Sequence, residues 1–541
     1  MKKRLSCYDM LAFTSILILL IGLVCTDAVQ KVLEVSDVSF LYNRVKNLRT
    51  CIFNGDFIGM FFYKDMQNWG YGSSFFYGYL TLIPFIFIKS FKTFWKIFYI
   101  VSLLTMYFGV RCLFKRFVKR YDLLAFLFIT CYNSLICFMS LSTYLNFYAI
   151  GLSFFFISFC VDFFRDKKSF IPASIMFYLV LNTHMLTASL SFLACVFTCI
   201  YYLDKSQFKR YIKFFLITLS LCSFYIVNFI YHTSGGVLNT QAGRKYFVNM
   251  CLNDSKSYMF TFRGFSDILG VGFLGKNLGL MTMSIVSAVT LIYLLKKHRP
   301  SDKNLIVLIF CIISIVLSTY PIWGYLYKTF GIVYQFPSRF SFYILFSLIL
   351  IGFRHLDSYK VLRNILVLDS LLAVAWCSLV MTPNDASSFS SYDYNVSNSI
   401  GQGEYLQKDF DFNIFSGEPK VVDTNKFEYP YELVQKYTII DMSRNRSDNT
   451  VITIPKLWYK GYKAYTFESN KQLKQLKVTK GYSQQVQIDV GNYNGKVIVY
   501  YTTTWWLYLW EICSYSYLLG VLIYYGYKQR DSIKLQGISL R

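Results

Sequence analysis

Acidic residues are scarce in this sequence, and their scarcity limits what the chain can be. Its 541 residues hold 30 Asp and Glu against 55 Lys and Arg, with only four His. In a soluble protein, a net charge of +25 would suggest a nucleic-acid partner. Here the basic residues cluster in short loops between apolar runs, which is the positive-inside pattern of membrane proteins. We therefore exclude nucleic acid as a partner.

Motifs for nucleotide chemistry and for disulfide pairing are also missing. The chain has no Gly-rich phosphate loop, no ATP motif and no internal repeat. It has 14 cysteines, but nearly all lie in apolar runs and none lies between Thr382 and Thr504. This distribution does not fit a disulfide framework, so we interpret the cysteines as small core residues.

Long apolar runs dominate the chain, which is 55% hydrophobic and 20% aromatic. Runs near membrane-spanning length predict an all-α polytopic membrane protein with about 12 transmembrane helices. We interpret the run after the basic N-terminus as a retained signal anchor, with the N-terminus in the cytoplasm. The expected spans are 10–28, 93–114, 122–141, 145–164, 169–185, 187–203, 211–231, 277–296, 304–324, 338–353, 361–381 and 505–527.

The basic loops set the orientation. Counting from an inside N-terminus places every basic loop and the C-terminus in the cytoplasm, and leaves the first outer loop, 29–92, outside. Within that loop the apolar run of 73–90 contains Pro84 and is only about 14 residues long, so we expect it to rest on the outer leaflet. The first outer loop would then consist of juxtamembrane helices.

A polar segment follows residue 381. Its second half alternates between apolar and polar residues at 451–454, 463–467, 486–490 and 496–501, which predicts strands of a small β-sandwich. The expected domains are therefore a transmembrane domain at 1–381, an extracytoplasmic β-rich domain at 382–504, and the last transmembrane helix with a cytoplasmic tail at 505–541.

The first outer loop contains the main candidates for chemistry. Asp37 and Arg44 lie two turns apart, on one face if the segment is helical. A carboxylate there can accept a proton from an attacking hydroxyl, and an arginine can bind a lipid phosphate. A solvated loop is the simpler alternative. The aromatic and glycine run from Trp69 to Gly78 suits sugar or acyl contact, and equally an ordinary interfacial aromatic belt.

Other candidates lie on the expected spans. His184 lies near the outer end of a span, where it could serve function or join two helices by a hydrogen bond. Arg339 begins a span and could bind a phosphate or extend to the interface. Asp369 stands alone in an apolar run and is the best hint of transport. Glu34 and Asp37 are three apart and could share a divalent ion, but two acids make a weak metal site, so we expect no cofactor and leave a divalent metal as an unsupported alternative.

Four short pieces, in this order, resemble a known family. They are Asp37-x6-Arg44, Gly70-Tyr71-Gly72-x2-Phe75-Phe76-Tyr77, Gln335-Phe336-Pro337-x-Arg339-Phe340, and Ile454-Pro455-Lys456-x-Trp458-Tyr459-Lys460-Gly461-Tyr462. The chain resembles the bacterial YfhO-type membrane proteins and the related membrane family named after pyruvoyl-tetrahydropterin synthase. These are similar to the GT-C superfamily of membrane glycosyltransferases. The pieces run from the first outer loop to the β-rich domain, so the resemblance covers most of the chain.

The resemblance implies a GT-C-like fold in the bacterial cell membrane, with a catalytic acid in the first outer loop. Asp37 matches that acid. The implied donor is a polyprenyl-phosphate-linked sugar, and the implied acceptor is a cell-envelope glycan outside the membrane. The residues expected to bind substrate or lipid phosphate are Arg44, Trp69, Tyr71, Tyr77, His184 and Arg339. One departure is the Phe40-Leu41-Tyr42 run after Asp37, where a histidine is expected.

The expected function is a membrane glycosyltransferase that modifies a teichoic acid or another envelope polysaccharide. Three alternatives remain open: a transporter or flippase for lipid-linked glycan, a non-catalytic assembly protein for envelope polysaccharide, and a polysaccharide polymerase. The spans carry few charges, which makes a polar path for transport less obvious.

Overall fold

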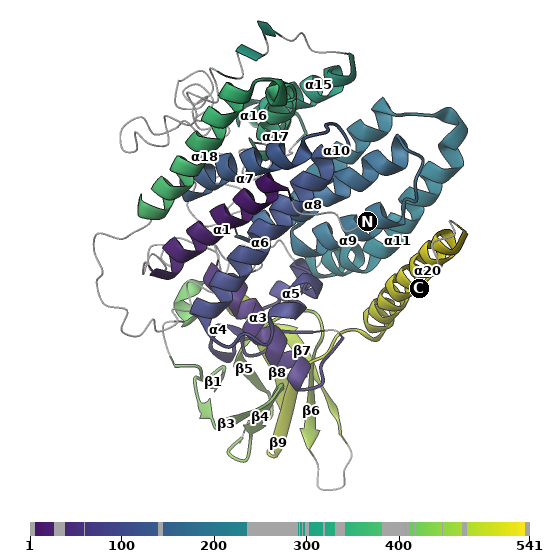
Figure 1. Ribbon diagram of the computed structural model, residues 1–541. Coiled ribbons are helices and arrows are strands. Elements are labelled where there is room, and N and C mark those ends of the chain that lie inside the picture. Colours follow the sequence, from purple (N-terminus) through teal and green to yellow (C-terminus); the bar gives the residue numbers. More distant parts are fainter. Residues whose placement is uncertain are drawn as a thin grey trace. The chain divides into compact units, whose positions relative to one another are not determined.

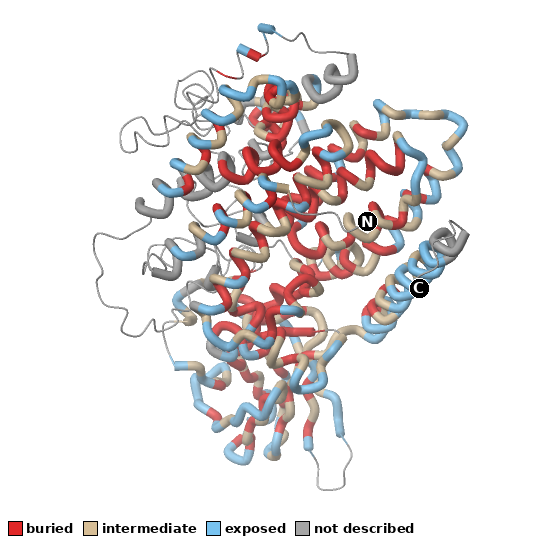
Figure 2. The backbone as a smooth tube through the Cα atoms, in the orientation of Figure 1, coloured by how far each residue is buried: buried red, intermediate tan, exposed pale blue. Residues whose placement is uncertain are grey.

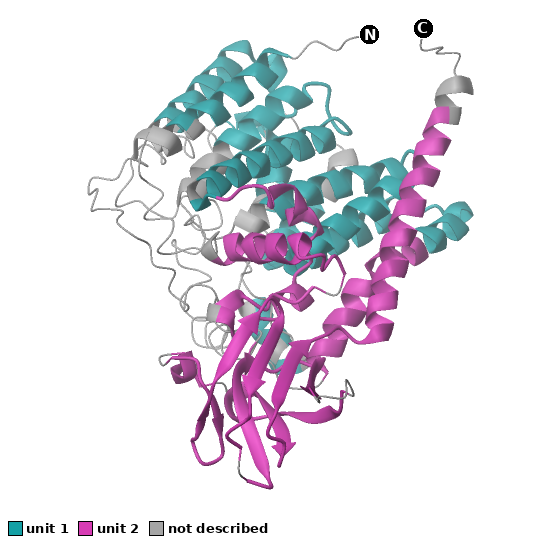
Figure 3. Cartoon of the chain, turned by 90° about the horizontal axis from the view of Figure 1, so that it is seen from below, with its two compact units in different colours: residues 1–38, 90–214, 244–392 teal, residues 39–89, 215–243, 393–541 magenta. Residues whose placement is uncertain are grey.

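The computed structural model describes residues 6–25, 38–58, 60–138, 144–234, 290, 293–294, 296–297, 302–317, 320–330, 341–380, 406, 411–415, 418–445, 447–467 and 473–535. Among these residues, three helical segments are long and apolar enough to cross a membrane: Thr93–Phe114, Lys205–Thr233 and Trp505–Arg530. Several shorter apolar helices accompany them, and the count of about 12 spans stays a prediction. The chain forms two compact units, coloured separately in Figure 3.

The first unit comprises residues 1–38, 90–214 and 244–392, and in its described part it is helical (Figure 1). Its helices are α1 (Cys7–Cys25), α6 (Phe91–Phe114), α7 (Tyr121–Phe138), α8 (Tyr144–Phe164), α9 (Ile171–Thr183), α10 (Met185–Tyr201), α15 (Asp302–Leu317), α16 (Tyr320–Phe330), α17 (Ser341–Gly352) and α18 (Lys360–Val380). Helix α8 packs against α6, α9 and α10. Gly109 and Gly151 let α6 and α8 approach closely, because a Cβ on Gly109 would lie 2.4 Å from the carbonyl oxygen of Gly151.

Most of these helices cover the predicted apolar runs, but the run at 304–324 differs. The structure describes two helices there, α15 ending at Leu317 and α16 beginning at Tyr320, and residues 318–319 lie outside the described part. Pro321 lies in the first turn of α16. Proline has no backbone N–H and clashes with a preceding helical turn, so it favours the start of a new helix. The run predicted at 277–296 lies largely outside the described residues.

The second unit comprises residues 39–89, 215–243 and 393–541. It contains α3 (Val38–Phe53) from Ser39 onward, the short helices α4 (Asp65–Asn68) and α5 (Ser73–Phe76), and the 3-10 helix η1 (Leu80–Phe85). It also includes α11 (Phe208–Thr233) from residue 215 onward, and α20 (Trp505–Leu535). The run at 73–90 therefore forms two short helical pieces, each far below the roughly 20 residues that a span needs.

Helix α20 is exposed along most of its length (Figure 2). Its exposed side chains include large apolar ones such as Leu519 and Ile523. Exposed apolar surface of this kind is suited to contact with lipid.

The β-rich part of this unit is one antiparallel sheet of nine strands in the order β2-β1-β5-β8-β7-β6-β9-β4-β3. The strands are β1 (Val421–Asp423), β2 (Glu428–Tyr429), β3 (Tyr431–Val434), β4 (Tyr437–Asp441), β5 (Thr450–Leu457), β6 (Tyr462–Phe467), β7 (Gln475–Lys480), β8 (Gln485–Gly491) and β9 (Lys496–Tyr501). Strands β5, β6, β8 and β9 confirm the four predicted strands.

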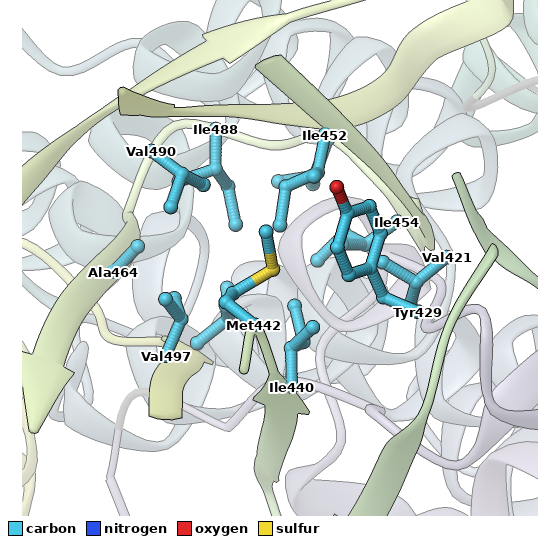
Figure 4. Close-up of a cluster of buried hydrophobic side chains, with 12 residues drawn as sticks. Val421, Tyr429, Ile440, Met442, Ile452, Ile454, Ala464, Ile488, Val490 and Val497 are labelled. Atoms are coloured by element: carbon cyan, nitrogen blue, oxygen red, sulfur yellow. The ribbon is translucent and has the colours of Figure 1, made fainter. Parts of the chain in front are cut away.

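The hydrophobic core of the sheet lies between strands from the two halves of the strand order. Strands β4 and β9 contribute from one half, and strands β5 and β8 contribute from the other. Ile440 on β4 and Val497 on β9 meet Ile452 on β5 and Ile488 on β8, as Figure 4 shows. These residues alternate with exposed or half-buried neighbours along each strand, as the period of two requires. Strands from the two halves thus bury their apolar side chains in one cluster, and the β-rich character predicted for this segment is confirmed.

Candidate functional site

The aromatic–glycine segment, residues 60–78, folds into a tight loop in the second unit. Phe62 and Tyr71 form an isolated antiparallel bridge, and the amide of Tyr71 donates to the carbonyl of Phe62 at 3.2 Å. Between them, the amide of Gly70 donates to the carbonyl of Asp65 at 3.0 Å. Gly70 has a φ of +78°, in the left-handed region that glycine adopts without strain. The glycine therefore closes the loop that carries Asp65 and Trp69.

The end of strand β5 is hydrogen-bonded to this loop. The amide of Leu457 donates to the carbonyl of Trp69 at 2.9 Å, and Nζ of Lys456 donates to the carbonyl of Asn68. Next along the chain, Tyr459 packs beside Gly72. A Cβ on Gly72 would lie 2.7 Å from ring carbons of both Tyr459 and Phe75, so no side chain fits there. Two of the four sequence pieces are thus in direct contact.

Aromatic rings extend this contact into the sheet and into α11. The ring of Phe61 stacks on Tyr501 with centroids 4.3 Å apart and meets the edges of Tyr459 and Tyr462. The ring of Phe75 stacks on His232 of α11, with centroids 3.8 Å apart and an interplanar angle of 4°. Aromatic pairs in these geometries contribute about 0.5–1.5 kcal/mol beyond their buried area. The rings therefore join loop, sheet and helix into one packed body.

Helix α3 holds the other end of the segment. Arg44 is 1% exposed, its Nη2 donates to the carbonyl of Gly78 at 2.9 Å, and its guanidinium lies 4.8 Å from the ring centroid of Tyr77. One turn further, Arg49 donates to the carbonyls of Ile86 and Ile88. Two arginines of α3 thus fix the backbone that follows the aromatic–glycine segment.

Two charged side chains are buried within this body. Burial raises the pKa of Asp65 to about 7, while the hydrogen bond from the amide of Met66 and the nearby polar side chains of Asn43 and Asn47 act in the opposite direction. Burial lowers the pKa of Lys456 to about 8. Perturbed pKa values of this kind mark candidates for functional sites, although structural networks produce them too.

The expected binding residues of the first outer loop all lie in this unit. Trp69 is 3% exposed and packs its ring edge against Phe415, and Tyr71 is fully buried. Arg44, Trp69 and Tyr71 are therefore packed inside the second unit. Tyr77 is half-buried beneath Arg44. Their roles toward sugar or lipid phosphate stay predictions.

The remaining expected residues lie elsewhere. Asp37 and Arg339 lie outside the residues that the structure describes. His184 belongs to the first unit, where it is the N-cap of α10: its Nδ1 accepts from the amide of Thr187 at 3.2 Å and contacts Oγ1 of Thr187 at 3.0 Å. This contact gives His184 a capping role, and its predicted role toward phosphate is untested.

Sequence reasoning did not single out Glu511, which lies on α20 and is 1% exposed. The hydroxyl of Tyr79 donates to Glu511, and the hydroxyl of Tyr515 donates to that of Tyr79 at 3.0 Å. The sequence signal that could have identified Glu511 is an acidic residue inside an apolar run. Within the described ranges, no group of three or more His, Cys, Asp or Glu side chains is placed to hold a metal ion.

Comparisons of the chain with family models, with curated proteins and with solved structures found no match.

Proposed function

We propose that this chain is a GT-C-like glycosyltransferase of the bacterial cell membrane, with about 12 transmembrane helices and both termini in the cytoplasm. It would transfer a sugar from a polyprenyl-phosphate donor to an extracytoplasmic envelope polymer such as a teichoic acid or another polysaccharide. One observation carries the proposal. The aromatic–glycine segment, the end of β5 and α11 form one packed body, and α11 lies in a segment long and apolar enough to cross a membrane.

That arrangement suits a reaction between a lipid-bound donor and a polymer in water. The helices of such a body would reach the donor in the membrane, while the β-rich part would position the acceptor. In this scheme Asp37, directly before α3, accepts the proton of the attacking hydroxyl. The sequence resemblance, and not the arrangement of the two units, assigns stabilisation of the departing phosphate to Arg44 and Arg339 and its orientation to His184. Because Arg44 is buried against Tyr77 and Gly78, its contact with phosphate would require residues 77–78 to move.

The test is Asp37→Asn in a strain that depends on this protein for modification of its envelope. General-base catalysis contributes roughly 10²–10⁴-fold, so we expect the sugar content of the polymer to fall to background. The matched control is Asp448→Asn, which removes an exposed acid from the β-rich part. An unchanged polymer in the Asp37→Asn strain, at normal protein level, would exclude Asp37 as the catalytic base.

A non-catalytic role in polysaccharide assembly is the second candidate. It is favoured by the burial of Arg44, Trp69 and Tyr71, whose described contacts are with protein. In that case Asp37→Asn would leave the polymer unchanged, while deletion of the whole chain would alter it. Sugar transfer by the purified protein from a polyprenyl-phosphate donor separates the two candidates.

A further inference from the structure

Four connections of the first unit meet at one end of its helices. Arg116, after α6, pairs with Asp162 near the end of α8 at 2.7 Å. Lys167, after α8, pairs with Asp204 before α11 at 2.9 Å. Arg120, before α7, pairs with Asp357 before α18 at 3.2 Å. These ion pairs join residues 115–120, 162–168, 204–213 and 354–363 into one surface, called the basic surface below.

The basic surface has a large excess of positive charge. Its four segments contain 14 Lys and Arg but only four Asp and no Glu. Each of the four Asp side chains already pairs with Lys or Arg of the same surface. The lysines at 119, 205, 209 and 213 are exposed. The acids therefore neutralise only a small part of this charge and leave these lysines accessible to an external anion.

We propose that the basic surface binds the headgroups of anionic phospholipids. Its position supports this partner, because the apolar segment Thr93–Phe114 ends directly before Lys115 and the apolar segment Lys205–Thr233 begins within the surface. Residues at the ends of membrane-crossing helices lie at the depth of the phosphates. Clusters of Lys and Arg at that depth attract anionic lipids. This inference does not depend on the proposed glycosyltransferase activity.

The form of the surface favours many lipid headgroups over one small anion. Its charges come from four separate chain segments. Apart from Arg120, which pairs with Asp357, its exposed basic groups are lysines, which are mobile point charges. Lys119 lies between α6 and α7, Lys209 and Lys213 lie at the start of α11, and Lys360 begins α18. A site for one phosphate instead needs several donors that converge on one point.

The experiment measures the unfolding temperature of the full-length protein in neutral detergent, with added short-chain phosphatidylglycerol, short-chain phosphatidylcholine or inorganic phosphate. We expect phosphatidylglycerol to raise the unfolding temperature by several degrees more than phosphatidylcholine, and 0.5 M salt to remove most of that difference. The test variant carries Lys119→Gln, Lys205→Gln, Lys209→Gln and Lys213→Gln. The control variant loses the same charge from the β-rich part through Lys463→Gln, Lys477→Gln, Lys480→Gln and Lys496→Gln, all exposed in this structure.

The proposal holds if the test variant loses at least half of the preference for phosphatidylglycerol and the control variant keeps it. It fails if the wild-type protein shows no preference, if the test variant keeps the full preference, or if both variants lose it equally. A response to inorganic phosphate as large as that to phosphatidylglycerol would show a site for a free anion, and would also overturn it. An antibody against an affinity tag binds whether or not the protein is folded, so it checks that all samples contain the same amount of protein.

Discussion

The amide of Leu457 donates a hydrogen bond to the carbonyl of Trp69 at 2.9 Å, which ties the end of β5 to a loop near the start of the chain. The neighbouring Lys456 makes a similar contact with the carbonyl of Asn68. Both carbonyls belong to the segment closed by the Phe62–Tyr71 bridge, so the sheet and this loop depend on each other for their positions.

Gly72→Ala should weaken the contact between the loop and the sheet. The new Cβ would lie 2.7 Å from ring carbons of Tyr459 and Phe75, and both rings are buried. Overpacking of this kind costs about 1–3 kcal/mol, so the unfolding temperature in detergent should fall. Gly520→Ala is the control, because a Cβ there meets nothing within 4 Å. Equal unfolding temperatures for the two variants would contradict the packing.

Arg44→Lys separates a packing role from a phosphate-binding role. Lysine keeps the charge but loses the planar guanidinium that reaches Gly78 and covers Tyr77. If packing dominates, we expect a loss of about 1–3 kcal/mol in unfolding free energy, with unchanged affinity for donor in the protein that remains folded. If Arg44 binds the phosphate, the KM for a polyprenyl-phosphate sugar should rise while the unfolding temperature stays near that of the wild type.

Asp65 should make stability depend on pH. Its pKa of about 7 in the folded protein lies above the value of about 4 expected in the unfolded chain, so the folded state holds the proton more tightly. The stabilising contribution is therefore fully present below about pH 4 and is lost as the pH rises toward 7. Asp65→Asn removes this titration. Between pH 4 and pH 8, the variant should gain up to roughly 4 kcal/mol relative to the wild type.

The measurement for Asp65 is thermal unfolding in detergent across this pH range. Asp448→Asn, which replaces an exposed acid, is the matched control and should follow the wild-type pH profile. A constant difference between Asp65→Asn and the wild type at all pH values would mean that the carboxyl does not titrate in this window.

His184 offers a similar separation of roles. Asparagine is a good N-cap residue, so His184→Asn should keep the bond to the amide of Thr187 and unfold near the wild-type temperature. His184→Ala loses the cap and should cost about 0.5–2 kcal/mol. A histidine that also orients phosphate would make both variants defective in sugar transfer. Wild-type transfer by His184→Asn would leave only the capping role.

The pattern of residues along the chain was sufficient to predict the local elements. Alternation at 451–454 and 496–501 predicted strands β5 and β9, because the period of two follows directly from strand geometry. Apolar runs predicted helices such as α6 and α20, because a membrane segment must be apolar over its whole length. At 304–324 the apolar pattern predicted one span, and the structure describes two helices on either side of residues 318–319, with Pro321 in the first turn of the second.

The site depended on contacts that no local pattern contains. Trp69 and Tyr71 have the composition of an interfacial belt, yet the structure buries both. An aromatic ring at a membrane interface and one in a core look alike in sequence. The burial of Asp65 likewise follows from the packing of the loop near α3 and β5, on which its raised pKa depends.

The sequence by itself thus determined most of the apolar helices, the strands β5, β6, β8 and β9, and the order of the motifs, because each of these follows from residues close together in the chain. Only the tertiary structure decided that Leu457 meets Trp69, that Arg44 covers Tyr77, and that the basic connections of the first unit form one surface. Such contacts join residues far apart in the chain, and which of them form is decided by the packing of complete side chains against one another.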